Sequence, residues 1–487
     1  MKRLNPVMLA GTGSDVGKSL IATALCRIFL QDGFHPAPFK AQNMALNSFA
    51  TPDGLEIGRA QAVQADAAGI ECSSDMNPIL LKPAGNLSSQ VVVNGRPAGN
   101  REAISYFRKV EKEKLRSVAH TAFDRLAKKF NPIVLEGAGS IAEINLKDCD
   151  IVNMSMAAYA GADVILVADI DRGGVFASAY GSVMLQSPED RQRIKGIIVN
   201  KFRGDLRLFE HGRKMMENIC GMPVLGVVPM ADHIHIEEED SVSLAKKSTK
   251  PVEGKINIGV TLLRHISNFT DFNVLELHPD INLYYTSSPD DLDKADIVIV
   301  PGTKNTIDDI AFIHEAGLDD AIVKAGKMGK TVVGICGGYQ ILGEYVADPL
   351  AMEGMTAGIK GLGLLPVKTV IEREKTTRRS SFRFLNDSRE CFGYEIHMGH
   401  TVSQNPVCTF NDGSFDGCIG NGRCFGSYIH GILDNRAVLE WLLKPFGISV
   451  VNNIPDYAAY RENQFDLLAD WVRKYVDIQK IYEILEA

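Results

Sequence analysis

The sequence has no two cysteines at the C-x-x-C spacing of redox and metal motifs, although its 487 residues include nine cysteines. Scattered cysteines in an odd number are not a disulfide framework, so we expect a cytoplasmic protein. No apolar run reaches the roughly 20 residues that span a bilayer, and no membrane partner is expected. His397 and His400 form an H-x-x-H, but without a thiolate or carboxylate at ligand spacing they predict no zinc site.

An excess of positive charge is also missing. The chain has 52 Lys and Arg against 60 Asp and Glu, a formal net charge of -8. Because nucleic-acid phosphates are bound by clustered Lys and Arg, we expect no nucleic-acid partner and favour small-molecule substrates. The sequence contains no low-complexity tract, and 45% hydrophobic residues allow a large folded core. At ~150 residues per domain, the length allows two or three domains.

Two series of short, mostly β-branched apolar runs, each followed by helical patterns, divide the sequence. This alternation predicts α/β domains with mostly parallel sheets. The runs are 7–9, 133–135, 164–168, 197–199 and 224–228 in the first series, and 256–260, 297–300, 331–335 and the mixed strands 392–398 and 425–429 in the second. Residues 231–255, charged and rich in Ser and Thr, predict a linker. We therefore expect domains at 1–230 and 256–450 and a helical tail at 451–487.

The run GTGSDVGKS, residues 11–19, lies between the first strand and a helix with apolar periodicity, which is the setting of a phosphate-binding loop. Backbone N–H groups at the helix N-terminus cradle phosphate, Lys18 reaches the β- and γ-phosphate oxygens, and the Ser19 hydroxyl ligates magnesium. The sequence thus predicts ATP and Mg²⁺ as cofactors. The loop residues expected at the nucleotide are Gly13, Asp15, Val16, Gly17, Lys18 and Ser19.

The run GICGGYQ, residues 334–340, overlaps the end of the apolar strand 331–335 and predicts a nucleophile elbow with cysteine in place of serine. Small residues permit the sharp turn from strand to helix that exposes the sulfur of Cys336. The following helix N-terminus favours a thiolate, and the Gly337 N–H lies where an oxyanion develops. The elbow therefore predicts nucleophilic catalysis on a carbonyl carbon.

This elbow resembles that of class I glutamine amidotransferases. The resemblance implies a second oxyanion donor at Gly302, after the strand 297–300, and a general base late in the chain, where GSYIHG supplies His430. Those enzymes carry a glutamate two residues after the histidine, and here Ile432 stands in its place. The third triad residue is therefore absent or comes from elsewhere, and Glu395 in GYEIH is a candidate.

The phosphate-binding loop has five residues between Gly11 and Gly17, one more than the usual motif, and so resembles that of dethiobiotin synthetase. The resemblance implies a phosphate-facing Lys40, the magnesium ligands Glu56 in EIGRAQ and Glu136 in EGAG, and an adenine-reading Asn200. Glu136 also ends the apolar strand 133–135, at the sheet edge where ligands bind. The alternative for Asn200 is a helix cap or turn residue.

Seven segments make the chain, over essentially its whole length, similar to the family of cobyric acid and cobyrinate diamide synthases. They are KAQNMALNS from residue 40, SQVVV from 89, EGAGS from 136, DIDRGG from 169, NKFRGD from 200, SNFTDF from 267 and CGGYQ from 336. The resemblance implies a P-loop dethiobiotin-synthetase-like doubly wound domain followed by a class I glutamine amidotransferase-like domain. Asp148 and Asp150, in INLKDCDI, are then expected near the substrate.

The family also implies a reaction. ATP converts the b, d, e and g side-chain carboxylates of adenosylcobyrinic acid a,c-diamide to acyl phosphates, and ammonia from glutamine displaces phosphate to give adenosylcobyric acid. Glutamine and the corrinoid are the substrates. The alternatives are a cobyrinate a,c-diamide synthase, or an ATP-dependent switch protein with an inactive glutaminase domain. The sequence leaves open the oligomeric state, the ammonia path, the order of amidations and the need for the adenosyl ligand.

Overall fold

A computed structural model describes residues 3–83, 88–102, 109–237, 239, 244, 247–354, 356–448 and 454–486. Parts of the predicted linker 231–255 and of the predicted tail 451–487 lie outside these described residues. The chain divides into two compact units, the first comprising Met1–Ala45, Ile57–Glu237 and Arg461–Ala487 and the second Leu46–Glu56 and Glu238–Tyr460. The predicted domain boundaries include neither the early segment of the second unit nor the return of the C-terminus to the first.

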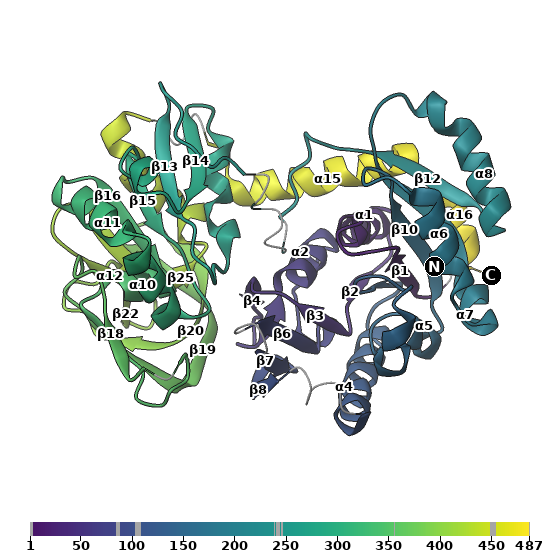
Figure 1. The fold of residues 1–487 in the computed structure, drawn as a ribbon, viewed down its shortest axis with the longest axis horizontal. Coiled ribbons are helices and arrows are strands. Elements are labelled where there is room, and N and C mark those ends of the chain that lie inside the picture. The colour runs from purple at the N-terminus through teal and green to yellow at the C-terminus, as the bar shows by residue number, and fades with distance from the viewer. Residues whose placement is uncertain are drawn as a thin grey trace. The chain divides into compact units, whose positions relative to one another are not determined.

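The first unit is built on a parallel six-stranded sheet with the order β12-β11-β10-β1-β9-β2 (Figure 1). Its strands are β1 Val7–Gly11, β2 Ala37–Phe39, β9 Ile133–Glu136, β10 Asp163–Asp169, β11 Ile194–Phe202 and β12 Val224–Pro229. Each apolar run predicted for this half lies in one of these strands. The runs are continuous rather than alternating because both faces of a central parallel strand are buried, and β1 is buried at every position.

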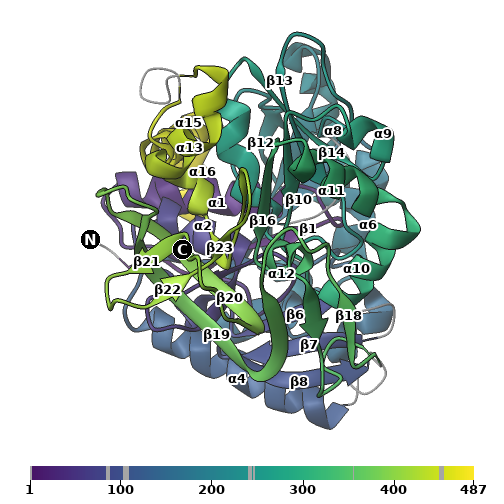
Figure 2. The ribbon, with the colours of Figure 1, turned by 90° about the vertical axis from the view of Figure 1, so that its left-hand side faces the viewer.

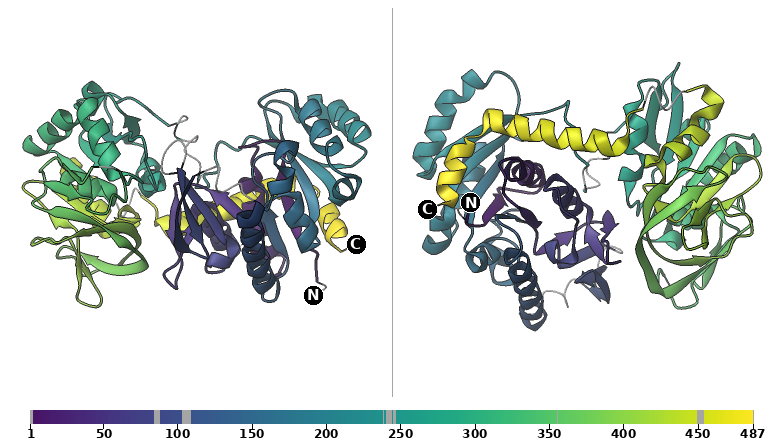
Figure 3. Two further views of the ribbon diagram at one scale, coloured as in Figure 1. Left: turned by 60° about the horizontal axis from the view of Figure 1, so that its bottom comes forward. Right: turned by 180° about the vertical axis from the view of Figure 1, so that it is seen from behind.

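Helices flank this sheet, and two of them come from the end of the chain. The helices of the first unit are α1 Lys18–Gln31, α2 Arg59–Ala67, α4 Lys109–Ala127, α5 Met154–Ala160, α6 Val175–Met184, α7 Pro188–Arg193, α8 Glu210–Cys220, α15 Tyr457–Tyr475, which belongs to this unit from Arg461 on, and α16 Ile478–Leu485, with short 3₁₀ helices η1 Ser74–Met76, η2 Ile144–Cys149 and η3 Leu206–Phe209. Leu468 and Ile481 of α15 and α16 share a buried core with Leu9. The Asn5 N–H donates to the Leu485 carbonyl at 2.8 Å, and Figure 3 shows α16 beside the N-terminus.

The second unit contains a mainly parallel sheet with the order β14-β13-β15-β16-β24-β23 and an antiparallel sheet with the path β18-β17-β19-β20-β25. Its strands are β13 Ile256–Thr261, β14 Ile281–Thr286, β15 Ile297–Val300, β16 Thr331–Ile335, β17 Tyr345–Ala347, β18 Gly358–Lys360, β19 Lys368–Phe384, β20 Cys391–Thr401, β21 Cys408–Phe410, β22 Phe415–Asp416, β23 Cys418–Ile419, β24 Cys424–Ser427 and β25 Ile429–His430. Its helices are α9 Pro289–Leu292, α10 Thr306–Glu315, α11 Leu318–Lys327, α12 Gly337–Leu342 and α13 Arg436–Leu443, with 3₁₀ helices η5 Phe269–Leu277, η6 Ile432–Asp434 and η7 Lys444–Phe446.

Several antiparallel strands, among them β19, were not predicted, whereas its partner β20 contains the predicted strand 392–398. The long pair β19 and β20 crosses the second unit (Figure 2). A small sheet of the first unit joins β3 Gln42–Met44, β6 Ile79–Pro83, β7 Ser88–Val93 and β8 Arg96–Glu102, and β4 Ser48–Ala50 pairs with β5 Glu56–Gly58. β19 carries the charged stretch EREKTTRR, which lacks the apolar runs used to predict strands. The α/β class with two successive parallel sheets is nevertheless confirmed.

Candidate active sites

The phosphate-binding loop joins the end of β1 to the start of α1. Gly17 has a φ of 96°, and a Cβ at this position would lie 2.0 Å from the Asn200 amide nitrogen, so only glycine fits. The Lys18 ammonium donates to the backbone carbonyls of Gly13 at 2.8 Å and Gly139 at 2.9 Å. The loop therefore wraps around Lys18 at the N-terminus of a helix, where a phosphate is favourably bound.

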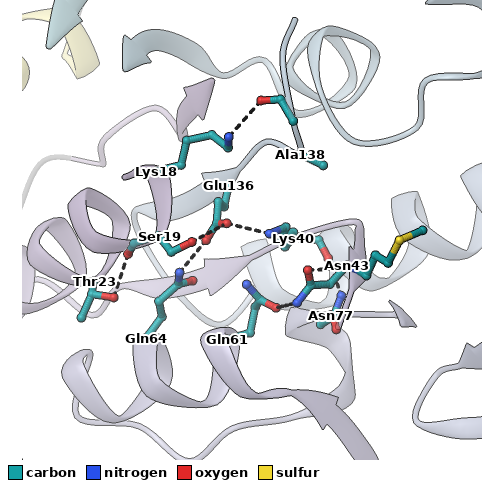
Figure 4. Close-up of polar contacts among 12 residues, drawn as sticks. Lys18, Ser19, Thr23, Lys40, Asn43, Gln61, Gln64, Asn77, Glu136 and Ala138 are labelled. Carbon is teal, nitrogen blue, oxygen red and sulfur yellow. Dashed lines mark hydrogen bonds and ion pairs between the residues drawn. The ribbon is translucent and has the colours of Figure 1, made fainter. Parts of the chain in front are cut away.

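Glu136, at the carboxyl end of β9, is the centre of a buried polar cluster (Figure 4). Its carboxylate accepts hydrogen bonds from the Lys40 ammonium at 2.6 Å, the Gln64 amide at 2.6 Å and the Ser19 hydroxyl at 2.9 Å. Burial by itself raises the pKa of Glu136, but the Lys40 charge and these three hydrogen bonds bring it below its ordinary value. The side chain is therefore ionised at neutral pH.

This cluster fits a magnesium ion that arrives with a nucleotide. Mg²⁺ takes oxygen ligands, usually one or two from the protein and the rest from phosphate and water. The Ser19 hydroxyl and the Glu136 carboxylate are such oxygens and lie 2.9 Å apart. The buried Gln64 side-chain oxygen has no hydrogen-bond partner among the described residues. Within those residues no three His, Cys, Asp or Glu side chains gather as a separate metal site.

The Lys18 ammonium lies in the same site in a poorly solvated position. Its pKa is lowered to about 8, mainly by burial; the nearby Glu136 charge opposes this shift and the Lys40 charge adds to it. A buried cation of this kind is stabilised when a phosphate supplies the opposite charge. The pKa of Lys18 is therefore consistent with a position prepared for an anion.

Other predicted nucleotide residues hold the loop to neighbouring strand ends. The Asn200 side-chain amide donates to the Val16 carbonyl at 2.9 Å. Asp15 forms ion pairs with Arg172 at 3.0 Å and with Lys201 at 3.2 Å. The structure thus brings these residues to the phosphate-binding loop, and their contacts with ATP stay predictions.

Of three other acids predicted at the synthetase site, two make other contacts and one is exposed. Glu56 belongs to the second unit, where it pairs with Lys375 at 2.5 Å. One Asp150 oxygen accepts from two backbone N–H groups just before α5, at 3.0 and 2.9 Å, and so stabilises the chain locally. Asp148 is exposed on η2. The magnesium role of Glu56 and the substrate roles of Asp148 and Asp150 stay predictions.

In the second unit, Cys336 occupies a sharp turn between β16 and α12. Its φ of 51° and ψ of -108° are unusual for a side chain of this kind and typical of a nucleophile elbow. A Cβ at Gly338 would lie 1.9 Å from the Val300 carbonyl oxygen, and one at Gly337 would lie 2.5 Å from the Thr303 methyl group. The two glycines therefore allow α12 to start directly against the end of β15.

A histidine and an aspartate complete this site. His430 lies beside both Asp271 and Cys336, and both influence its pKa. Its Nδ1 lies 2.7 Å from Asp271 Oδ2, and the Gly431 N–H donates to Asp271 Oδ1 at 3.1 Å. Cys336, His430 and Asp271 are 7%, 1% and 4% exposed. The three side chains form a buried Cys-His-Asp triad.

The triad favours a charged imidazole. Burial lowers the pKa of His430, but the negative charges of Asp271 and Cys336 and the hydrogen bond to Asp271 raise it to about 10. An imidazolium beside Cys336 favours the thiolate, which is the nucleophilic form of cysteine. The arrangement can therefore attack a carbonyl carbon and then protonate a leaving amine.

The predicted oxyanion residues lie beside this triad. A Cβ at Gly302 would lie 3.2 Å from His430 Cε1, and a Cβ at Gly337 would lie 3.0 Å from the Thr303 backbone nitrogen. The turn after β15 therefore runs along the elbow, where backbone donors reach a developing oxyanion. Donation by Gly302 and Gly337 stays a prediction.

Comparison with known proteins identifies a family for each part of the chain. A model described as the CobQ/CobB/MinD/ParA nucleotide binding domain matches residues 7–244, and one described as the CobB/CobQ-like glutamine amidotransferase domain matches residues 257–438. The chain is 60% identical to the cobyric acid synthases of Phocaeicola vulgatus and Bacteroides fragilis, with 99% of each chain covered in both comparisons. It is 54% identical to that of Parabacteroides distasonis, over 100% of this chain and 99% of the relative. This chain belongs to the cobyric acid synthase family.

Membership of the cobyric acid synthase family makes the chain an enzyme of the glutamine amidotransferase type with a nucleotide-binding domain. The predicted order of a P-loop domain followed by a glutaminase domain is confirmed. Among the described residues, no helix combines the length and the apolar character that crossing a bilayer requires.

In this member of the cobyric acid synthase family, the candidate triad acid chosen from sequence was wrong. Glu395 hydrogen-bonds to Arg378 and, at 2.9 Å, to the Ser380 hydroxyl, whereas Asp271 contacts His430. Asp271 lies in SNFTDF, one of the family segments, and follows β13. The position of Asp271 after a predicted parallel strand could have identified it as the triad acid, because parallel strands bring their carboxyl ends to one edge of the sheet.

Proposed function

We propose that the chain uses ATP to amidate the b, d, e and g side-chain carboxylates of adenosylcobyrinic acid a,c-diamide, giving adenosylcobyric acid. Full-length identity of 60% to cobyric acid synthases supports this substrate over the a,c-diamide synthase alternative. The observation that carries the chemistry is the presence, on one chain, of a buried Cys336-His430-Asp271 triad and a phosphate site around Lys18 and Glu136. The assembled triad also favours an active glutaminase over an inactive one.

In the glutaminase site, the Cys336 thiolate attacks the side-chain amide carbon of glutamine. The negative charge that develops on the oxygen is stabilised by the Gly302 and Gly337 N–H groups. The His430 imidazolium donates its proton to the departing nitrogen, so that ammonia leaves and a thioester remains. His430 then takes a proton from water, which hydrolyses the thioester to glutamate. Asp271 keeps the imidazole oriented throughout.

In the synthetase site, a corrinoid carboxylate oxygen attacks the γ-phosphorus of ATP, ADP leaves and an acyl phosphate forms. Lys18 and Lys40 bind the phosphate oxygens, and Ser19 and Glu136 would hold magnesium, which neutralises charge on the β- and γ-phosphates. Ammonia then attacks the acyl carbon and phosphate leaves. Activation is needed because a free carboxylate is a poor electrophile.

Cys336→Ala tests this division of work. We expect it to abolish glutamine-dependent amidation and to leave amidation supported by a high ammonium concentration intact, because the synthetase site does not use the thiolate. The product mass is followed after incubation with ATP, Mg²⁺ and either the a,c-diamide or cobyrinic acid. Loss of both activities in a folded variant contradicts the two-site scheme, and amidation of cobyrinic acid alone supports the a,c-diamide synthase instead.

A further inference from the structure

The segment Leu46–Glu56 belongs to the second unit, although the residues before and after it belong to the first. It includes β4 and the first residue of β5. The chain therefore leaves the first unit, which carries the phosphate site, packs within the second unit, which carries the triad, and returns to the first unit. The chain on either side of the segment contacts the phosphate site, and the middle of the segment contacts neighbours of the triad.

The chain on both sides of the segment reaches the Glu136 cluster of the phosphate site. Before it, Lys40 contacts Glu136 at 2.6 Å and the Asn43 amide donates to the Gln61 side-chain oxygen at 3.1 Å. After it, Gln61 and Gln64 lie on α2, and the Gln64 amide donates to Glu136 at 2.6 Å. Figure 4 shows these side chains gathered around one carboxylate.

This cluster is incompletely paired. Gln61 and Gln64 are fully buried, and within the described chain the Gln61 amide nitrogen and the Gln64 side-chain oxygen have no hydrogen-bond partner. Buried polar atoms are normally satisfied, so the cluster is expected to rearrange when a ligand supplies partners. A magnesium nucleotide would compete for Lys40 and Glu136, whose contacts hold the chain before the segment and, through Gln64, the chain after it.

In its middle, the segment is hydrogen-bonded to Asn268, the residue that precedes η5. The Asn47 side-chain oxygen accepts from the Asn268 N–H at 2.5 Å, and the Asn268 side-chain oxygen accepts from the Ser48 N–H at 3.0 Å. Asn268 has a left-handed φ of 52°, and its carbonyl accepts from the Asp271 N–H at 3.1 Å. The position of the triad acid is therefore connected to Asn47.

A second contact reaches the triad from the histidine side. The rings of Phe49 and Tyr394 meet edge to face with their centroids 4.5 Å apart. The Tyr394 ring stacks on the His430 ring at 5.2 Å. The segment thus contacts the neighbours of both Asp271 and His430, through two side chains separated by one residue.

We propose that Asn47 and Phe49 are positioning residues of the glutaminase triad, which make its geometry depend on occupancy of the phosphate site. The proposal rests on the proposed function, since it couples its two half-reactions. When nucleotide engages Lys40 and Glu136, the chain on either side of the segment shifts, and the segment in turn shifts Asn268 and Tyr394. Glutamine hydrolysis then follows ATP binding, and ammonia is not released without an acceptor.

The test is the ratio of glutamate release with ATP, Mg²⁺ and the a,c-diamide to release without them. The ratio is measured within one preparation, so the fraction of folded protein does not affect it. We expect a wild-type ratio of at least about fivefold, as for ordinary allosteric coupling, and a ratio below about twofold in Asn47→Ala and in Phe49→Ala. Phe49→Tyr, which keeps the ring, should retain the wild-type ratio.

Asn282→Ala is the matched control. Asn282 is a buried asparagine of the same unit whose amide makes two hydrogen bonds, to Lys250 at 3.1 Å and to Asn257 at 2.9 Å. Its variant should keep the wild-type ratio. A wild-type ratio of one, unchanged ratios in both segment variants, or an equal loss in Asn282→Ala overturns the proposal.

Ammonium-dependent amidation is measured on the same preparations. Asn47→Ala and Phe49→Ala should retain it, because neither side chain acts in the synthetase step. If the wild type amidates but the variants keep their ratios, only the positioning role fails. If the wild type does not amidate at all, the proposed function fails and the coupling falls with it.

Discussion

Replacing Asp271 with asparagine removes the charge from the triad with little change in shape. Asp271 accepts with both oxygens, from His430 at 2.7 Å and from the Gly431 N–H at 3.1 Å. Asparagine has one oxygen, so one of these contacts becomes donor against donor. If the side-chain oxygen of this asparagine still accepts from the Gly431 N–H, its amide nitrogen faces His430 Nδ1. The neutral imidazole then carries its proton on Nε2 rather than on Nδ1. In that tautomer Nε2 cannot accept the proton of Cys336.

The size of the effect follows from the charge on His430. Its pKa rises from 6.5 to about 10, which corresponds to about 5 kcal/mol in favour of the imidazolium. The Asp271 charge is the largest contribution that raises this pKa. In serine triads the same isosteric change costs about 10⁴ in kcat. Because a thiol ionises more readily than a hydroxyl, we expect a loss of about 10³ in kcat for glutamate release.

Glutamate release is measured at neutral pH, and ammonium-dependent amidation reports on the other site. The control is Glu395→Gln, since Glu395 is a buried carboxylate of the same unit that pairs with Arg378 instead of His430. It should lose far less activity. A kcat for Asp271→Asn within about tenfold of wild type, or an equal loss in Glu395→Gln, would refute the assignment of the acid.

Three further predictions concern charge in the two sites. Glu136→Gln should lower amidation from either nitrogen source by about 10² or more, because it removes the charge that pairs with Lys40 at 2.6 Å; a normal ammonium-dependent rate with normal magnesium dependence would contradict this. In the protein without nucleotide, the pKa of Lys18 is about 8, so this side chain loses its positive charge between pH 7 and 9. The ATP dissociation constant should therefore increase over that range, by up to about tenfold. A dissociation constant that calorimetry shows to be independent of pH would contradict this prediction. The folded pKa of His430 lies above 6.5, so its contribution to stability is complete below pH 6.5 and is lost as the pH rises through about 10. In urea unfolding, the stability difference between wild type and Asp271→Asn should shrink over that window, and a constant difference would argue against it.

The parts of the structure that were predicted from sequence are those determined by residues close to one another in the sequence. The strand at 133–135 is a buried apolar run, and its last position fixes Glu136 at the sheet edge. Lys18 and Cys336 each follow a strand and start a helix, so local spacing was enough to identify them. Motifs of this kind encode a turn and its ligand-facing atoms together.

The exchange of segments between the units could not be predicted in the same way. Leu46–Glu56 has no pattern that distinguishes packing in the second unit from packing in the first, because its partners Asn268 and Tyr394 are more than 200 residues away in sequence. Helix α15 likewise shows the apolar period of a helix, but not which core receives it. Pairings of this kind depend on the folded surface rather than on spacing.

The triad acid shows the same limit in its chemistry. An acid two residues after the histidine is one way to place a carboxylate beside the imidazole, and in this chain the fully buried Ile432 occupies that position. The reaction requires only a carboxylate oxygen near His430 Nδ1 and a second contact that fixes its orientation, which the Gly431 N–H supplies. Strands β13 and β24 belong to one sheet, in which β13, β15, β16 and β24 are all parallel. η5 follows β13 and His430 follows β24, so both segments begin at the same edge of the sheet. Any loop at that edge can supply the acid, and a missing H-x-E is therefore not evidence of an inactive glutaminase.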